Sequence, residues 1–164
     1  MNIEFSLFDP AVIYAGRKQF DCGHAVIDKF VRDSLVQQVK KQLSVAYVLT
    51  DPDQQDRFVG FFTLAHHAID ASRQIPCARL IMLGVDQAYK NKQLGSRLMK
   101  QALVITKAAS AHMGCYGLYL DADPAAIGFY QKLGFALLQG NKTPAPSPMF
   151  IAVASITEED ENKG

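Results

Sequence analysis

The 164-residue sequence has no apolar run approaching the roughly 20 residues that a membrane-spanning helix needs. Its N-terminus also lacks the basic start and apolar core of a secretory signal peptide. The three cysteines, Cys22, Cys77 and Cys115, are widely spaced and form no CxxC pair of the kind that binds zinc. These absences argue against a membrane, secreted or zinc-binding protein. They predict a cytoplasmic protein with reduced thiols and no metal site.

Net charge is also small, at +1, but it is unevenly distributed. The C-terminal segment TEEDENKG (157–164) contains four acids and one base. Such a segment predicts a flexible acidic tail that follows a single domain over residues 1–156. Without the tail the chain has 16 bases and 12 acids, a net charge of +4, which is compatible with an anionic partner.

Hydrophobic periodicity predicts an α/β fold with a mixed sheet of six to seven strands and about four helices. Composition predicts a turn at 51–56, Gly114 is expected to end a long helix, and Pro124 suits the first turn of a short one. The expected strands are 3–8, 44–50, 57–69, 79–86, 116–121, 135–139 and 148–153, and the expected helices lie within 20–41, 94–113 and 123–134.

The segment QAYKNKQLGS (87–96) lies between an apolar strand and an amphipathic helix. The N–H groups at a helix start have no intrahelical partners and lie at the positive end of the helix dipole, so they favour anions. Lys90, Lys92 and Arg97 add positive charge nearby. The loop contains only one glycine, Gly95, so from its residues alone an anion site and an ordinary exposed turn are equally supported.

Two segments at the expected distance resemble the GCN5-related N-acetyltransferase (GNAT) family. They are RLIMLGVDQAYKNKQLGSRLMKQAL (79–103) and DADPAAIGFYQKLGF (121–135). Within that family, FDCGHAVIDKFVRDSL (20–35) resembles the toxin acetyltransferases of bacterial toxin–antitoxin pairs, which act on aminoacyl-tRNA. The resemblance implies a GNAT fold whose sheet splays at an acetyl-CoA site.

The resemblance also implies which residues bind acetyl-CoA as cosubstrate. The strand is expected to offer its backbone to the pantetheine amides, and the loop and helix start are expected to hold the pyrophosphate. Phe129 is expected to pack in the core and is kept as a further candidate contact. The remaining implied contacts are Leu83, Gly84, Val85, Lys90, Asn91, Lys92, Gln93, Leu94, Gly95 and Ser96.

The loop departs from the family pattern at Gln93, where the first glycine is expected. If this position requires a positive φ, a side chain costs about 1–2 kcal/mol. If it requires close approach of the backbone to phosphate, the Cβ obstructs the ligand. About 1.4 kcal/mol is a tenfold change in affinity, so the sequence predicts weakened rather than abolished acetyl-CoA binding.

The family's general acid corresponds to Tyr130 in this sequence. Aminolysis of a thioester releases a thiolate that needs a proton, and a tyrosine of pKa about 10 can donate one to a thiol of pKa about 8.5. The alternative role for Tyr130 is packing in the helix core. A direct attack of the amine on the thioester, with Tyr130 as acid, is therefore the predicted mechanism.

A general base is harder to predict. Asp86, Asp121 and Asp123 are candidates, although strand-end or helix-cap roles are favoured for each. His66 and His67 are adjacent on a strand, so at most one can face a substrate cleft, and a structural role is favoured there too. Neither histidine pairs with a serine or cysteine nucleophile in a way that supports a hydrolase.

The predicted substrate is the α-amino group of aminoacyl-tRNA, and the predicted effect is a block of translation. The predicted partners are a ribbon-helix-helix antitoxin and a second copy of the chain in a homodimer. The alternatives are a small-molecule or peptide N-acetyltransferase, and a GNAT domain that acts as a binding module. An RNA substrate requires a basic face, for which the candidates are Arg17, Lys18, Lys40, Lys41, Lys90, Lys92, Lys100 and Lys107.

Overall fold

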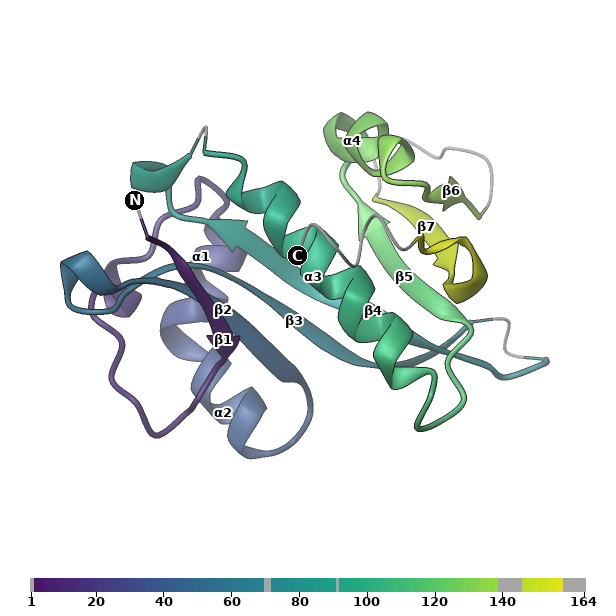
Figure 1. Cartoon of the computed structure of the whole chain (residues 1–164), viewed down its shortest axis with the longest axis horizontal. Coiled ribbons are helices and arrows are strands. Elements are labelled where there is room, and N and C mark those ends of the chain that lie inside the picture. The colour runs from purple at the N-terminus through teal and green to yellow at the C-terminus, as the bar shows by residue number, and fades with distance from the viewer. Residues whose placement is uncertain (1, 70–71, 91, 139–145, 158–164) are drawn as a thin grey trace. The chain divides into compact units, whose positions relative to one another are not determined.

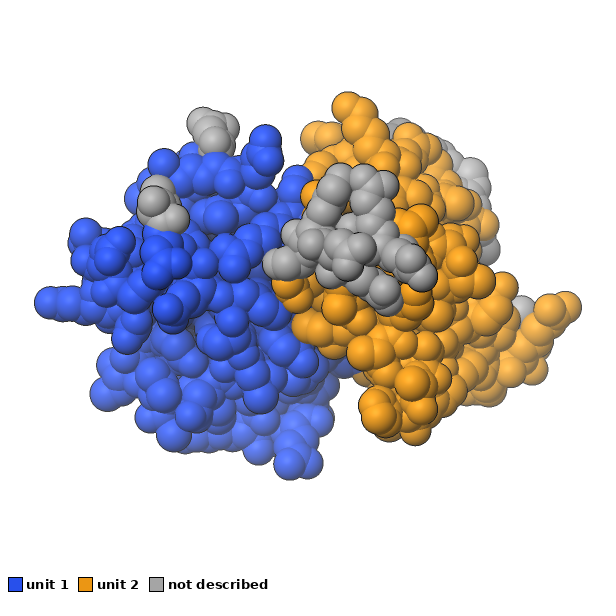
Figure 2. Space-filling model, viewed as in Figure 1, with its two compact units in different colours: residues 1–65, 82–99 blue, residues 66–81, 100–164 orange. Residues whose placement is uncertain are grey.

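The computed structural model describes residues 2–69, 72–90, 92–138 and 146–157 (Figure 1). The chain divides into two compact units, which Figure 2 colours separately. Unit 1 contains residues 1–65 and 82–99, and unit 2 contains residues 66–81 and 100–164. In the described part of the chain, no helix has the length and apolar character required to cross a membrane.

Within the described residues, seven strands form a mixed sheet in the order β1-β2-β3-β4-β5-β7-β6. The pairs β1–β2, β2–β3, β5–β7 and β6–β7 are antiparallel, and β4 and β5 are parallel. In the parallel pair, Ala78 lies opposite Leu118 and Arg79 lies opposite Tyr119. Strand β5 continues to Ala122, beyond these paired positions. The strands are β1 (Glu4–Leu7), β2 (Val45–Asp51), β3 (Arg57–Ile69), β4 (Ile75–Val85), β5 (Gly117–Ala122), β6 (Ala136–Leu137) and β7 (Ser147–Ala152).

The described residues include four α-helices: α1 (Ala25–Asp33), α2 (Leu35–Lys40), α3 (Leu94–Ala109) and α4 (Ile127–Lys132). Five short 3-10 turns are also present: η1 (Arg17–Gln19), η2 (Pro52–Gln54), η3 (Gln87–Tyr89), η4 (Pro124–Ala126) and η5 (Val153–Ser155). Pro124 opens η4, as predicted, because a missing N–H costs nothing at a helix start. The predicted α/β fold, with six to seven strands and about four helices, is confirmed.

An aromatic core fills unit 1. Phe58 and Phe61 of β3 are fully buried, and Phe20 meets both rings edge-on at centroid distances of 5.3 and 5.8 Å. Val31 of α1 and Leu35 of α2 belong to the same cluster and are also fully buried. The apolar faces of the two short helices therefore cover the strands β1 to β3, an arrangement that can be followed in Figure 1.

The core of unit 2 lies on one face of β5. Leu118 and Leu120 are buried, and Met149 and Ile151 of the neighbouring strand β7 are buried as well. Alternate residues of a strand face opposite sides, so Tyr119 lies on the other face of β5 and is half-buried. Strand β5 thus has a buried face and a partly exposed face.

Two predicted boundaries are each wrong by four residues. Helix α3 ends at Ala109 rather than at 113, because the N–H groups of Ala111 and His112 bond to carbonyls three residues earlier and tighten the last turn. Gly114 therefore does not end the helix. Strand β4 begins at Ile75 instead of 79, and the carbonyl of Pro76 accepts a bond from Tyr116 N. The predicted acidic tail lies outside the described residues except for Thr157.

Candidate functional site

The turn η3 leads from β4 toward α3, and Asp86 holds it in place. Asp86 is 5% exposed, and its Oδ1 accepts a hydrogen bond of 2.9 Å from Ala88 N. Its Oδ2 accepts a bond of 3.4 Å from Asp21 N. Both carboxylate oxygens are thus used by the backbone, so Asp86 is a helix cap and not an available base.

Tyr89 anchors the same turn from inside unit 1. Its hydroxyl donates a hydrogen bond of 2.7 Å to Asp51 Oδ2, at the end of β2. Burial, followed by this bond to Asp51, raises the pKa of Tyr89 to about 12. Sequence reasoning missed this pair. The available signs were a lone tyrosine in a polar loop and an acid at the end of a predicted strand.

Lys90 ties the loop to the segment that precedes α1. Its Nζ donates a hydrogen bond of 2.6 Å to the carbonyl of Cys22. The neighbouring Gln87 donates from its backbone N to Asp21 O at 2.8 Å, and from its side chain to Asp21 Oδ1 at 3.0 Å. A Cβ at Gly84 would lie 3.2 Å from Cys22 Sγ, so glycine permits this close approach. The ammonium group of Lys90 therefore already donates a hydrogen bond within the protein.

The start of α3 has the geometry of an anion site. Gln93 adopts φ +58°, a left-handed conformation, and its carbonyl accepts the bond from Arg97 N at 3.1 Å. The N–H groups of Leu94, Gly95 and Ser96 precede this bond, so the helix offers them no acceptor. A Cβ at Gly95 would meet no atom within 4 Å, so packing does not require glycine there. These three N–H groups could hold the oxygens of a pyrophosphate.

The other predicted acetyl-CoA contacts of unit 1 vary in exposure. Lys92 is exposed, Gly84 is buried, and Leu83 and Val85 are half-buried in β4. Arg97 donates from Nη1 to Ile3 O at 2.9 Å, so it anchors the N-terminus to α3. Asn91 lies outside the described residues. Lys90 and Lys92 are thus both exposed positive charges near the start of α3, and the ammonium group of Lys90 is bonded to Cys22 O.

Tyr130 lies on α4 in unit 2. Its ring is 5.7 Å from Phe135 and 5.2 Å from Phe129, and both contacts are edge-on. Burial, followed by the negative charge of Asp123, raises the pKa of Tyr130. Phe129 is 39% exposed, and the expectation that it packs in the core is wrong, because α4 is a short helix with no buried residue.

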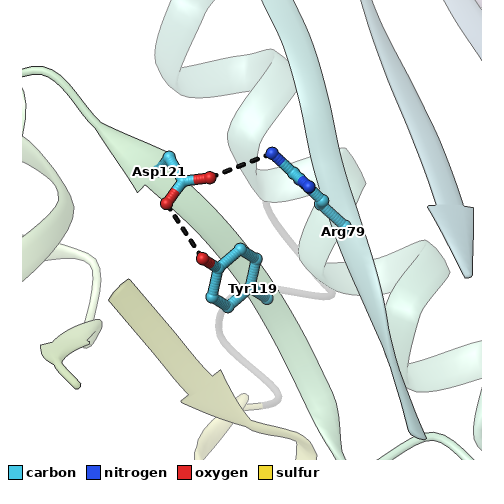
Figure 3. Close-up of polar contacts among 3 residues, drawn as sticks. All are labelled: Arg79, Tyr119 and Asp121. Carbon is cyan, nitrogen blue, oxygen red and sulfur yellow. Dashed lines mark hydrogen bonds and ion pairs between the residues drawn. The ribbon is translucent and has the colours of Figure 1, made fainter. Parts of the chain in front are cut away.

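The two histidines face opposite sides of β3, as predicted. His66 is exposed, whereas His67 is half-buried with its ring 4.6 Å from that of Tyr119. Burial, followed by the positive charge of Arg79, lowers the pKa of His67. Asp121, on β5, accepts hydrogen bonds of 2.9 Å from Arg79 Nη2 and from the hydroxyl of Tyr119 (Figure 3). Both carboxylate oxygens of Asp121 thus already accept hydrogen bonds within the protein.

Four of the eight basic candidates donate to backbone carbonyls. Arg17 bonds to Val31 O at 2.7 Å, and Lys18 bonds to Arg32 O at 3.2 Å. These carbonyls end α1, so both cations cap that helix. Lys90 bonds to Cys22 O, as described above, and Lys107 bonds to Ile156 O at 3.5 Å. Half of the predicted basic set therefore has a structural use.

A model of the acetyltransferase (GNAT) family matches residues 22–135, more than half of the chain. The chain belongs to the GNAT family. It is similar to a crystal structure of a bacterial toxin, at 33% identity and a TM-score of 0.90, over 98% of this chain and 96% of that one. It is also similar to a mutant of the toxin AtaT bound to the C-terminus of the antitoxin AtaR and acetyl-CoA. That match has 26% identity, a TM-score of 0.84, and coverage of 94% and 95%.

Curated GNAT relatives include proteins of two kinds. The probable toxin TacT of Sinorhizobium fredii is 24% identical over 161 residues, which cover 85% of this chain and 86% of that protein. A probable glucosamine 6-phosphate N-acetyltransferase of Drosophila melanogaster is 35% identical over 63 residues. Those residues cover 38% of this chain and only 27% of the fly protein. The toxin similarity thus spans most of both chains, whereas the other is local.

Proposed function

We propose that this GNAT chain is an acetyl-CoA-dependent toxin that acetylates the α-amino group of aminoacyl-tRNA and so blocks translation. The observation that carries the proposal is the start of α3, where a left-handed Gln93 precedes three N–H groups without helical acceptors. The 33% identity to a bacterial toxin over 98% of this chain supports the toxin assignment.

The residues of unit 1 fit acetyl-CoA as a substrate. The N–H groups of Leu94, Gly95 and Ser96 would bind pyrophosphate oxygens, and the exposed Lys92 would add charge. Leu83 to Val85 would offer backbone groups to the pantetheine amides. The related AtaT toxin was solved with acetyl-CoA bound, which supports this assignment.

The proposed transfer needs one proton donor and little help from a base. The neutral amine attacks the thioester carbonyl, a C–N bond forms and the C–S bond breaks. The CoA sulfur takes the hydroxyl proton of Tyr130, the amine's surplus proton passes to solvent, and the resulting tyrosinate regains a proton from solvent before the next turnover. An aminoacyl α-amino group has a pKa near 8, so a useful fraction is already neutral at pH 7. This chemistry suits a protein in which Asp86 and Asp121 are otherwise engaged.

Replacement of Tyr130 by phenylalanine tests the mechanism. We expect turnover with aminoacyl-tRNA to fall about 100-fold or more, the usual contribution of a general acid. The dissociation constant for acetyl-CoA, measured by calorimetry, should stay within about twofold, because the hydroxyl is used only in the reaction. Tyr116→Phe is the matched control, since Tyr116 is 60% exposed. Equal turnover in Tyr130→Phe and the control would remove Tyr130 from the mechanism.

A second candidate function is acetylation of a small amine, and the local similarity to a glucosamine 6-phosphate N-acetyltransferase favours it. Release of CoA with a panel of acceptors separates the two functions: aminoacyl-tRNA, glucosamine 6-phosphate and a lysine peptide. Acetyl-CoA binding without turnover on any acceptor would instead favour a binding module.

The proposed partners are an antitoxin of the ribbon-helix-helix type and a second copy of this chain, in the cytoplasm. The AtaT structure bound to the C-terminus of AtaR supports an antitoxin partner. Light scattering after size exclusion, with and without the product of an adjacent small gene, tests both partners. A monomer that does not bind that product would contradict this part of the proposal.

A further inference from the structure

Unit 2 contains a polar cluster that the proposed mechanism does not use. Arg79 lies on β4, Tyr119 and Asp121 lie on β5, and His67 lies on β3. Tyr119 and Asp121 are two residues apart, so they share the sheet face opposite the buried Leu118. The side chains of Arg79 and Asp121 are 40% and 32% exposed, so a ligand can reach them.

Neighbouring groups hold the guanidinium of Arg79 in one orientation. Its Nη2 is 2.9 Å from Asp121 Oδ2, and its Cζ lies 5.6 Å from the centroid of the Tyr119 ring. The hydroxyl of Tyr119 in turn fixes the other carboxylate oxygen of Asp121, at 2.9 Å (Figure 3). A group ordered in this way loses little entropy when it binds a ligand.

Arg79 also has an unused donor. Its Nε is buried and has no hydrogen-bond partner among the described residues. This atom has almost no accessible surface, so the donors of Arg79 that a ligand can reach are those of its two Nη groups. By contrast, Arg17, Arg32 and Arg97 each donate to a backbone carbonyl of the scaffold.

The chemistry of a guanidinium indicates which ligand fits. Its planar array of N–H donors matches the oxygens of a phosphate better than an ammonium does. The ion pair with Asp121 is partly exposed, and such pairs contribute little stability, so it positions Arg79 without saturating it. An oxyanion can therefore bind at the remaining donors.

We propose that Arg79 binds a phosphate group of the acceptor substrate, with Tyr119 and Asp121 as positioning residues. This inference rests on the proposed acetyltransferase function and adds the acceptor-binding residue to it. Strand β5 leads from Asp121 into η4 and then α4, which carries Tyr130 in the same unit. The phosphate is either a phosphodiester at the 3′ end of aminoacyl-tRNA or the phosphomonoester of an amino sugar.

The experiment compares acceptors that differ in the phosphate. One pair is aminoacyl-tRNA and aminoacyl-adenosine, and the other is glucosamine 6-phosphate and glucosamine. In Arg79→Gln we expect kcat/KM for the phosphorylated member of the accepted pair to fall about 10- to 100-fold, mainly through KM, since a charged hydrogen bond is lost. The member without phosphate should change less than about twofold. Whichever pair is accepted identifies the source of the phosphate.

Two further variants distinguish a specific contact of Arg79 from a general effect of positive charge. Arg79→Lys keeps the charge but loses the planar donors, so its KM should lie between that of Arg79→Gln and that of the wild type. Lys132→Gln, on α4, removes one exposed positive charge of the same unit and should leave both acceptors unaffected. Equal losses for phosphorylated and unphosphorylated acceptors in Arg79→Gln would overturn the inference.

Binding of adenosine monophosphate gives a readout that does not need turnover. We expect its addition to shift the NMR signals of the Arg79 Nε–H and the His67 ring, and we expect Arg79→Gln to abolish the His67 shift. Unchanged spectra in the folded wild-type protein would overturn the inference. If these shifts appear but no acceptor releases CoA, the acetyltransferase proposal fails while phosphate binding by Arg79 stands.

Discussion

Gln93 adopts a backbone conformation that side chains disfavour. Its φ of +58° lies in the left-handed region, where an L-residue other than glycine costs about 1–2 kcal/mol. The sequence comparison with the family pattern predicted that a glycine is missing at this position, and the structure supplies the reason. The same residue begins α3, since its carbonyl accepts the bond from Arg97 N.

Replacement of Gln93 by glycine should relieve this strain. We expect the free energy of unfolding to rise by about 1 kcal/mol. The reason is that the strain of a side chain at positive φ exceeds the additional conformational entropy that glycine loses on folding. Acetyl-CoA should bind up to about tenfold more tightly, since the Cβ beside the proposed phosphate site is removed. Urea denaturation and calorimetry measure the two effects.

Gln55→Gly is the matched control for Gln93→Gly. Gln55 has a φ of +60° after η2, in the turn between β2 and β3. We expect a similar gain in stability and no change in acetyl-CoA affinity. If both variants bind acetyl-CoA with wild-type affinity, the side chain of Gln93 does not limit binding.

At the level of elements, the segment between β4 and α3 is a braced loop. Asp86 caps η3, Tyr89 bonds to Asp51, and Lys90 bonds to the Cys22 carbonyl. Three side chains of one short segment thus bond to other parts of unit 1. This bracing fixes where α3 begins, and therefore where its unpaired N–H groups lie.

Lys90 and Lys92 are expected to respond differently to substitution. Lys92→Gln should weaken acetyl-CoA binding a few-fold and reduce its dependence on salt, because an exposed charge near the phosphates is lost. Lys90→Gln should lower the free energy of unfolding by about 1 kcal/mol, since its bond to Cys22 O is lost. Calorimetry at two salt concentrations and urea denaturation distinguish these effects. Equal losses of affinity with unchanged stability would mean that Lys90 binds the phosphates instead.

At the scale of the whole molecule, two tyrosines link stability to alkaline pH. The pKa of Tyr89 in unit 1 and that of Tyr119 in unit 2 are both raised to about 12, chiefly by burial and then by bonds to Asp51 and Asp121. In the unfolded chain both ionise near pH 10. The contribution of the two tyrosines to the free energy of unfolding is complete below pH 10. It is lost as the pH rises toward 12, because the unfolded state releases its protons first.

The free energy of unfolding should therefore fall steeply between pH 10 and pH 12. Tyr89→Phe and Tyr119→Phe should each make this fall shallower, and the double variant more so, since the units carry separate tyrosines. Urea denaturation at several pH values measures the slope. If the double variant kept the wild-type slope, the loss of stability at alkaline pH could not be assigned to Tyr89 and Tyr119.

Much of the fold could be predicted because its cause is local. The partner strand predicted at 57–69 matches β3 at both ends, and the apolar spacing after Leu94 matches the start of α3. The errors arose where distant contacts decide a boundary. Pro76 belongs to β4 although a proline favours a loop, and its carbonyl bonds to Tyr116, which lies forty residues later.

The sequence by itself determined the family pattern, the likeness to toxin acetyltransferases and the position of the missing glycine, since each is a matter of residue type and spacing. Only the tertiary structure decided what the side chains do. It directs Lys90, Arg17 and Arg97 to backbone carbonyls, and it leaves the Nε of Arg79 without a hydrogen-bond partner in the part of the chain that the structure describes. The physical reason is that a long cation reaches whichever acceptor folding brings near it, and sequence spacing does not specify that acceptor.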